Sequence, residues 1–130
     1  YGSIPYINSA LAADGDLQLP RFYEYNGKFD YQAATEYIVE DLDKAAALLP
    51  TDWGTSADNG RVTKGAALAI KAKALLYAGS PLMNENSRNG ATFDAGYMTR
   101  AAEASQTGNS IRSVADKGIG HTDRFLEMSG

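Results

Sequence analysis

Acidic side chains are the most numerous groups in this chain that could do chemistry. The 130 residues carry 16 Asp and Glu against 12 Lys and Arg, with one histidine and no cysteine. Glu36, Glu40 and Asp43 lie about one helical turn apart, in a segment whose apolar residues occupy the opposite side. A glycosidase needs two carboxylates that face each other across a cleft at about 5–9.5 Å, which spacing along one helix face does not provide. We therefore expect these three acids to form a solvated helix face.

The single histidine gives no basis for nucleophilic or metal chemistry. His121 lies in the Gly-rich sequence IGHTDRF, and the nearby Ser110 and Asp123 do not have the spacing of a known triad. A metal site with one His would need several carboxylates gathered by the fold. The acidic turn at residues 14–16 does not reproduce an EF-hand calcium loop. We expect His121 to lie in an exposed loop, and we expect no metal, no cofactor and no enzymatic activity.

Two polar segments carry aromatic residues of the kind that bind sugars. Trp53, the only tryptophan, lies in a polar loop, and two tyrosines alternate in a segment bounded by Pro and Gly. Sugar rings stack on such aromatic rings, while carboxylates and amides bind their hydroxyl groups. The alternative is that these rings clamp irregular segments onto the helices, as buried aromatics do. The candidate glycan-binding residues are Trp53, Tyr23, Tyr25, Asp52 and Asn59.

Two amphipathic helices must position the tryptophan loop. The first is predicted at 31–48, between Asp30 as its N-cap and Pro50, which forces Leu49 out of the helical region. Its apolar stripe comprises Ala34, Tyr37, Ile38, Leu42, Ala45, Leu48 and Leu49.

The second helix is predicted at 64–78. Thr63 is its expected N-cap, and Gly79 is its expected left-handed stop, with Pro81 just beyond. Tyr37 and Tyr77 are expected in the core. The two helices are predicted to pack antiparallel through Ile38, Leu42, Ala45, Leu68, Ala74 and Leu75.

The rest of the chain is less regular in pattern. A further helix is predicted near 94–107, ending at Gly108, with no sustained period from Asn109 onward and at most a short helix near 123–128. Residues 1–29 read as an irregular segment lying on the helices, with turns at Asp14-Gly15 and Asn26-Gly27. The predicted fold class is all-α, a tetratricopeptide-like helical hairpin with one further helix and irregular segments.

Bulk composition excludes some functions. The net charge is −4, which argues against nucleic acid as a partner, because such binding depends on Lys and Arg that neutralise phosphates. No apolar run approaches the roughly 18 residues of a membrane span. Without cysteine, no disulfide or thiolate site is possible.

Several motifs in residues 1–84 resemble the SusD/RagB family. Their order and spacing are those of a helix pair in that family and of the stretch that precedes it. Family members are several times longer, so the resemblance implies that residues 1–130 are a single helical domain within a larger SusD-like protein, of which this chain is a fragment. The motifs are Tyr1-Gly2-Ser3-Ile4-Pro5-Tyr6 followed by Pro20-Arg21, Asp41-Leu42-Asp43-Lys44-Ala45, Leu49-Pro50, GRVTKGAA at 60–67, and Leu75-Leu76-Tyr77.

The resemblance implies a non-catalytic function at the cell surface. Members are outer-membrane lipoproteins that hold nutrients, usually glycans or oligosaccharides, beside a SusC-like TonB-dependent transporter. Their lipid is attached to an N-terminal Cys, so the anchor is expected upstream of Tyr1. Asp41, Arg61 and Thr63 are then structural motif residues: Arg61 holds the loop by pairing with a carboxylate such as Asp41, and Thr63 caps a helix.

Two other functions stay open. A tetratricopeptide-like hairpin could serve as a protein-interaction scaffold with no ligand site in this segment, although the chain shows no second copy of a 34-residue repeat. A glycosidase is the least favoured alternative, because no pair of acids has the required arrangement.

Overall fold

Three helices form the body of the protein, and two very short strands precede them. In chain order these are β1 (Glu24–Tyr25), β2 (Lys28–Phe29), α1 (Asp30–Leu48), α2 (Lys64–Ala78) and α3 (Ala95–Leu126). The computed structural model describes residues 5–7, 10, 12–15, 24–25, 28–54, 58, 60–83 and 92–126, with side chains described within 5–7, 10, 12–15, 31–54, 58, 60–83 and 92–111.

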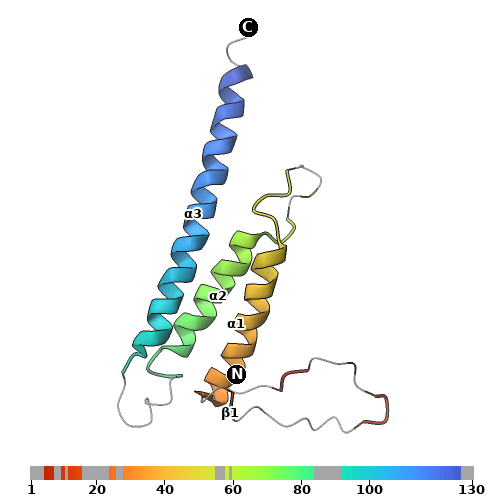
Figure 1. Ribbon diagram of the computed structural model, residues 1–130, viewed down its shortest axis with the longest axis vertical. Coiled ribbons are helices and arrows are strands. Elements are labelled where there is room, and N and C mark those ends of the chain that lie inside the picture. Colours follow the sequence, from red (N-terminus) through yellow and green to blue (C-terminus); the bar gives the residue numbers. More distant parts are fainter. Residues whose placement is uncertain are drawn as a thin grey trace.

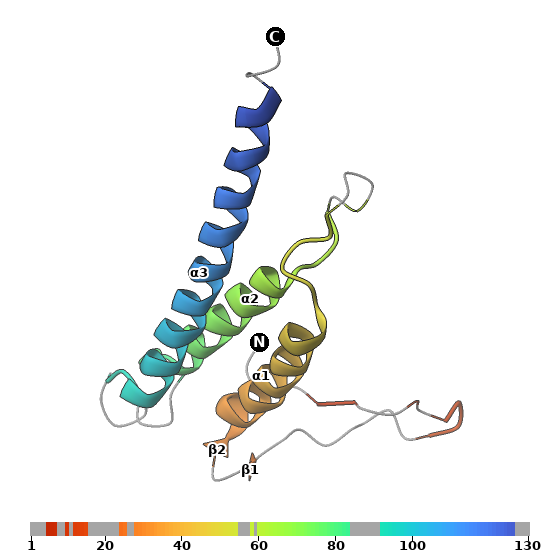
Figure 2. The same cartoon turned by 45° about the horizontal axis from the view of Figure 1, so that its top comes forward.

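The helices lie side by side, with α2 packed against both of its neighbours (Figures 1 and 2). Successive helices run in opposite directions (Figure 1). The predicted all-α fold is confirmed, and so is the helical hairpin at 31–48 and 64–78.

Helix α1 begins at Asp30 and ends before Pro50, as its sequence predicts. Its buried face differs from the predicted stripe by a rotation about the helix axis. Val39 is only 3% exposed and lies in the core, whereas Ile38, predicted in the interface, is 38% exposed. Leu42 is half-buried and packs against the core. The prediction for Ile38 was wrong because α1 offers several small apolar residues, so more than one face can be buried.

Two polar side chains on the buried face of α1 have hydrogen-bond partners. Gln32 Nε2 donates to the Ala78 carbonyl at the end of α2, at 3.4 Å, and Thr35 Oγ1 donates to the Tyr31 carbonyl at 2.8 Å. Buried polar groups need such partners, because an unsatisfied one costs about 1–3 kcal/mol. Gln32 therefore ties the start of α1 to the end of α2.

Helix α2 has the predicted N-cap. Thr63 is extended, with φ −110° and ψ 167°, and its hydroxyl accepts from the Ala66 N–H. Ala67, Leu68 and Leu75 are buried as expected. Tyr77, predicted in the core, is 51% exposed, because α1 and α3 cover other faces of this helix.

Gly79 ends α2 without adopting the predicted left-handed conformation. Its φ is −83° and its ψ is −5°, which is right-handed helical geometry that any residue can adopt. The reason for glycine is space: a Cβ here would lie 2.8 Å from Tyr97 Cβ and 3.2 Å from the Asp94 carbonyl oxygen. The chain returns to α3 at this point, and the Asp94 N–H donates to the Gly79 carbonyl at 2.9 Å.

Helix α3 is much longer than predicted. Its 32 residues span about 48 Å at 1.5 Å per residue, about twice the length of α2, and it continues beyond the hairpin (Figure 1). The predicted stop at Gly108, the irregular stretch from Asn109 and the loop around His121 were therefore wrong. Gly108 is tolerated because it packs against α2, where a Cβ would lie 3.7 Å from Leu68 Cβ.

Local hydrogen bonds also explain why polar residues do not interrupt α3. Thr107 Oγ1 donates to the Glu103 carbonyl and Ser110 Oγ to the Gln106 carbonyl, each one turn back. Such side chains can satisfy themselves on the helix and need not break it. Composition alone made this segment look irregular.

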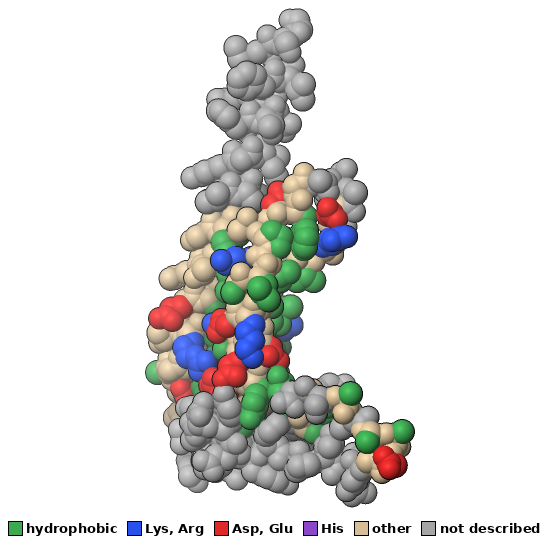
Figure 3. Space-filling view, turned by 45° about the vertical axis from the view of Figure 1, so that its right-hand side comes forward, with side chains coloured by type: hydrophobic (Ala, Val, Ile, Leu, Met, Phe, Trp, Pro, Cys, Tyr) green, Lys and Arg blue, Asp and Glu red, His purple; other side chains and the backbone are tan. Residues whose placement is uncertain are grey.

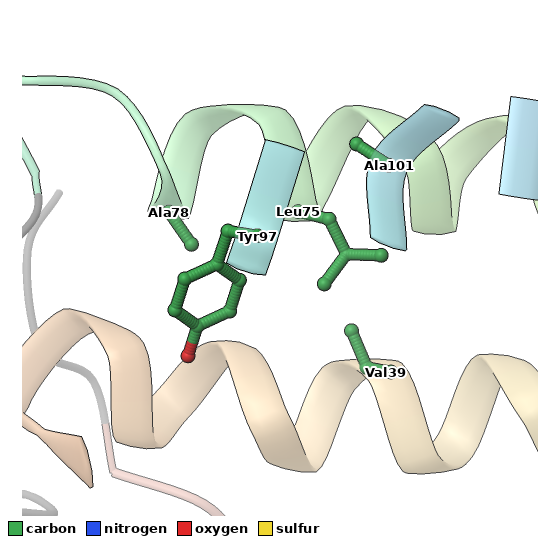
Figure 4. Close-up of a cluster of buried hydrophobic side chains, with 5 residues drawn as sticks. All are labelled: Val39, Leu75, Ala78, Tyr97 and Ala101. Atoms are coloured by element: carbon green, nitrogen blue, oxygen red, sulfur yellow. The ribbon is translucent and has the colours of Figure 1, made fainter. Parts of the chain in front are cut away.

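The core consists of two clusters along the hairpin. One brings together all three helices through Val39, Leu75, Ala78, Tyr97 and Ala101 (Figure 4). The other contains Ala46, Ala67 and Leu68, flanked by half-buried side chains that include Leu42 and Ile111.

The segment before α1 contains one pair of strands among its described residues. β1 and β2 are antiparallel, with Glu24 opposite Phe29 and Tyr25 opposite Lys28, and β2 leads directly into α1. The Asn26-Gly27 turn lies outside the described residues. The predicted turn at Asp14-Gly15 is confirmed by a hydrogen bond of 3.0 Å from the Gly15 N–H to the Ala12 carbonyl.

Candidate binding surface at the loop end of the hairpin

The tryptophan loop between α1 and α2 is held closed at its base. The Lys64 N–H donates to the Pro50 carbonyl at 2.9 Å, and Trp53 Nε1 donates to the Val62 carbonyl at 3.0 Å. Both bonds join the outgoing stem to the returning one. Trp53 is half-buried in this position.

Arg61 completes the clamp on Trp53. Its guanidinium carbon lies 5.1 Å from the centre of the indole ring, and its Nε lies 2.9 Å from Asp58 Oδ1. A guanidinium over an aromatic face is an attractive cation–π arrangement. The predicted role of Arg61 in holding the loop fits this geometry, but its carboxylate partner is Asp58 and not Asp41. One face of the indole is thus occupied, and a sugar ring could stack only on the other.

Asp52 lies beside Trp53 and is exposed. Its Oδ1 accepts from the Gly54 N–H at 3.1 Å, which supports the left-handed turn at Gly54, where φ is 72°. Of the other candidates, Tyr23 and Asn59 lie outside the described residues, and the Tyr25 side chain is not described.

The tyrosine segment and the tryptophan loop lie at opposite ends of α1 (Figure 1). β1, which contains Tyr25, precedes the first turn of this helix, and Trp53 follows its last turn. The 19 residues of α1 span about 28 Å. The structure therefore does not bring Tyr25 and Trp53 together, in keeping with the helix predicted between them.

A pocket of about 380 Å³ lies beside the tryptophan loop, between the first turns of α2 and the middle of α3. Its walls include the small residues Gly65 and Ala69 of α2, and Ala104 and Gly108 of α3. Small side chains leave room between two packed helices. The sequence analysis did not find this pocket, because α3 was expected to end at Gly108, among the α3 residues that line it.

Polar groups line the same pocket. Thr51, Thr63, Ser105 and Asn109 contribute hydroxyl and amide groups, and no charged side chain lines it within the described part of the chain. Thr51 is two residues from Trp53, so the loop forms part of the pocket rim. A concave site with a largely apolar wall and a few polar groups is the usual form of a small-molecule site.

The motif residue Asp41 has a different contact from the predicted one. Tyr6 donates its hydroxyl hydrogen to Asp41 Oδ2 at 2.8 Å, and its ring stacks on Tyr37 with centres 4.6 Å apart. The hydrogen bond to Asp41 raises the pKa of Tyr6. Two of the motifs that resemble the SusD/RagB family, the opening segment with Tyr6 and the segment of α1 that starts at Asp41, are thus in direct contact.

Of the three acids predicted on a solvated helix face, Glu36 is the one whose side chain is largely buried. Its carboxylate accepts hydrogen bonds from both terminal nitrogens of Arg100, at 2.7 and 2.9 Å, and from the Tyr97 hydroxyl at 2.8 Å. Burial, followed by the hydrogen bond to Glu36, raises the pKa of Tyr97. The hydrogen bonds that Arg100 donates to Glu36 raise the pKa of Arg100.

This Glu36 cluster joins α1 to α3. The ring of Tyr97 lies in the core with its hydroxyl toward α1 (Figure 4). Arg100 and Tyr97 both hold the carboxylate, so we interpret the cluster as a structural link and not as a catalytic acid. Its partners are 61 and 64 residues away in sequence, and no local pattern indicates them.

Charged side chains of both signs are mixed on one face of the helical body (Figure 3). One ion pair, Lys71 with Asp43, joins α2 to α1. Within the described part of the chain, no group of three or more His, Cys, Asp or Glu could hold a metal ion, and no helix is both long and apolar enough to cross a membrane.

Comparison with known proteins gives one similar structure. No family model and no curated protein matches this chain. A solved structure named BT4246 superposes with a TM-score of 0.69 at 28% sequence identity. The match covers 90% of this chain and 22% of BT4246, so the chain spans about a fifth of the length of that protein. This helical arrangement therefore occurs as one part of a larger protein.

Proposed function

We propose that this chain is part of a non-catalytic, SusD-like protein that captures glycans or oligosaccharides at the outer-membrane surface for a TonB-dependent transporter. The observation that carries the proposal is the way the resembling motifs meet. Tyr6 contacts Asp41, Arg61 clamps the tryptophan loop, and Thr63 caps α2. The similarity to BT4246 is compatible with a SusD-like fold.

The tryptophan loop is the proposed contact with the sugar. Trp53 offers one ring face that Arg61 does not cover, and exposed Asp52 lies next to it. An aromatic face beside polar groups matches the two sides of a sugar ring. The clamp on Trp53 serves this function as well, because a ring held in place loses less conformational entropy when a ligand binds.

Trp53→Ala tests this proposal against a purely structural loop. With a panel of oligosaccharides in calorimetry, we expect the loss of stacking to weaken binding about 2- to 10-fold. Loss of the bond to Val62 and of partial packing should lower the free energy of unfolding by about 1–3 kcal/mol, less than the about 3–5 kcal/mol of a fully buried Trp.

Trp53→Phe is the matched control. It keeps an aromatic face but removes the indole N–H that donates to the Val62 carbonyl. If stacking matters, Trp53→Phe should bind sugar more tightly than Trp53→Ala at similar stability. Equal sugar affinity in the parent and in both variants would remove Trp53 from the site.

A protein-interaction scaffold is the second candidate, and the outer face of α2 favours it. Ile70, Leu76 and Tyr77 are each more than half exposed on this helix. Helices that bind peptides or proteins present such apolar side chains. Capture of a protein partner that is lost with Ile70→Ser and Leu76→Ser, in a chain that binds no oligosaccharide, would favour this candidate.

A further inference from the structure

The pocket between α2 and α3 has a lining that selects against charge. None of the described residues that line it is ionisable, although Lys64 and Glu103 are close in sequence to lining positions. An ionised ligand that gave up water there would gain no opposite charge from the described lining, which disfavours its binding. The ligand that fits this pocket is therefore uncharged.

The size of the pocket limits the ligand further. Its volume of about 380 Å³ is near the lower end of the roughly 300–1,000 Å³ of small-molecule sites. The small walls at Gly65, Ala69, Ala104 and Gly108 let a flat ring approach both helices closely. A single ring fits this space better than an extended chain or a helix.

The pocket also has unused hydrogen-bonding groups. Neither the Ser105 hydroxyl nor the Asn109 amide has a hydrogen-bond partner among the described residues. At the start of α2, the Lys64 and Ala66 N–H groups are satisfied by Pro50 and Thr63. The neighbouring N–H of Gly65, a lining residue, has no such partner within the described part of the chain. These groups together offer both donors and acceptors.

We propose that the α2–α3 pocket is a subsite for one uncharged sugar ring, adjacent to the tryptophan loop. The apolar wall from Ala69, Ala104 and Ile111 takes the C–H face of the ring, and Thr51, Ser105 and Asn109 bind its hydroxyl groups. The inference rests on the proposed function and gives it a second contact. A longer oligosaccharide would then span the pocket and Trp53.

The test is a nuclear magnetic resonance titration of the whole chain with methyl glucoside, methyl galactoside and methyl N-acetylglucosaminide. Glucuronic acid and glucosamine serve as charged counterparts. We expect at least one neutral sugar to shift the Gly65 backbone N–H and the Asn109 side-chain amide, while the charged sugars shift neither.

Two kinds of variant locate the binding. Ala69→Leu fills the pocket from an exposed helix position and should abolish the shifts, whereas Ala102→Leu, on α3 outside the pocket, should leave them unchanged. Ser105→Ala and Asn109→Ala should each weaken binding about 2- to 10-fold, against no change for Gln106→Ala. Alanine is the best helix former, so the polar-to-Ala variants should remain folded.

Other outcomes would separate the two proposals. Sugar binding that shifts only the Trp53 indole and survives Ala69→Leu would overturn the pocket subsite and leave the proposed function standing. Binding of glucuronic acid as tight as that of the neutral sugars would overturn the argument from charge. If no sugar shifts any resonance of the chain, and no oligosaccharide binds in calorimetry, both proposals fail.

Discussion

At the scale of single residues, the same residue type serves different purposes according to its neighbours. Glu36 and Asp43 lie on one helix, and both looked like solvated acids. The side chain of Asp43 is 53% exposed, whereas that of Glu36 is 15% exposed and receives three hydrogen bonds from α3. A carboxylate with such partners stabilises a fold more than an exposed ion pair does.

Glu36→Gln measures this contribution. The variant keeps an oxygen for the Tyr97 hydroxyl but loses the charge that pairs with Arg100. We expect the free energy of unfolding to fall by about 1–2 kcal/mol, at the low end for charged hydrogen bonds, because the Arg100 side chain is 38% exposed. Urea unfolding measures this loss of stability. The control is Glu103→Gln on the exposed surface of α3, and it should change the free energy of unfolding by less than about 0.5 kcal/mol. Equal effects of the two changes would contradict the link.

Tyr97 makes the stability of the fold depend on pH in the alkaline range. Burial and Glu36 raise the pKa of its hydroxyl in the folded state above the ordinary value of about 10 in the unfolded state. The resulting stabilisation is fully present below pH 10 and is lost as the pH rises above it, by up to about 1.4 kcal/mol per pH unit.

Tyr97→Phe tests the assignment. The variant loses a hydrogen bond at neutral pH, but its stability should fall less steeply than that of the parent chain above pH 10. Some slope should persist, because burial also raises the pKa of Tyr31. Chemical unfolding at a series of pH values measures both slopes, and parallel curves would show that Tyr97 is not the titrating group.

At the scale of the elements, Gly79 and Gly108 differ in whether the fold leaves room for a side chain. Gly79 is required because Tyr97 and Asp94 leave no space for a side chain. Gly108, in the interior of α3, has room for a methyl group at ordinary contact distance from Leu68. Glycine at position 108 therefore lowers the stability of the helix and is not required by packing.

The paired variants Gly79→Ala and Gly108→Ala test this difference. Gly79→Ala forces a Cβ to within 2.8 Å of Tyr97 Cβ and should cost about 1–3 kcal/mol, as overpacking does. Gly108→Ala should stabilise by up to about 1 kcal/mol through helix propensity. Thermal unfolding of both variants measures the effects, and the same sign for both would show that packing at Gly79 is not the constraint.

At the scale of the whole molecule, the fold is a three-helix scaffold, and its described residues show no catalytic arrangement. The Glu36 carboxylate is engaged by Arg100 and Tyr97, and the described lining of the pocket has no ionisable group. General acid–base catalysis needs a titratable side chain within reach of the substrate. The match to about a fifth of BT4246 places such a scaffold within a larger protein.

We therefore predict that the chain does not turn over the glycans that we propose as its ligands. Incubation with oligosaccharides should release no new reducing ends, as measured by a reducing-sugar assay and chromatography. His121→Ala and Glu36→Gln should behave like the parent chain. Hydrolysis that one of these changes abolishes would overturn the prediction.

The sequence by itself determined the hairpin, its boundaries and the all-α class. Thr63 and Pro50 act within one turn of the backbone, so their effects can be read locally. The same is true of the turn at Asp14-Gly15. The resemblance to SusD/RagB proteins also rests on short motifs at fixed spacing.

Only the tertiary structure decided which faces of the helices are buried and which residues meet. Val39 replaces Ile38 in the core, and Glu36 finds Arg100, because the rotation of each helix is set by packing against the others. The continuation of α3 past Gly108, and with it the pocket, accompanies the packing of α3 against α2. Because small apolar residues lie on several faces of these helices, the sequence does not say which face is buried. The face that packs best against the neighbouring helices becomes the buried one.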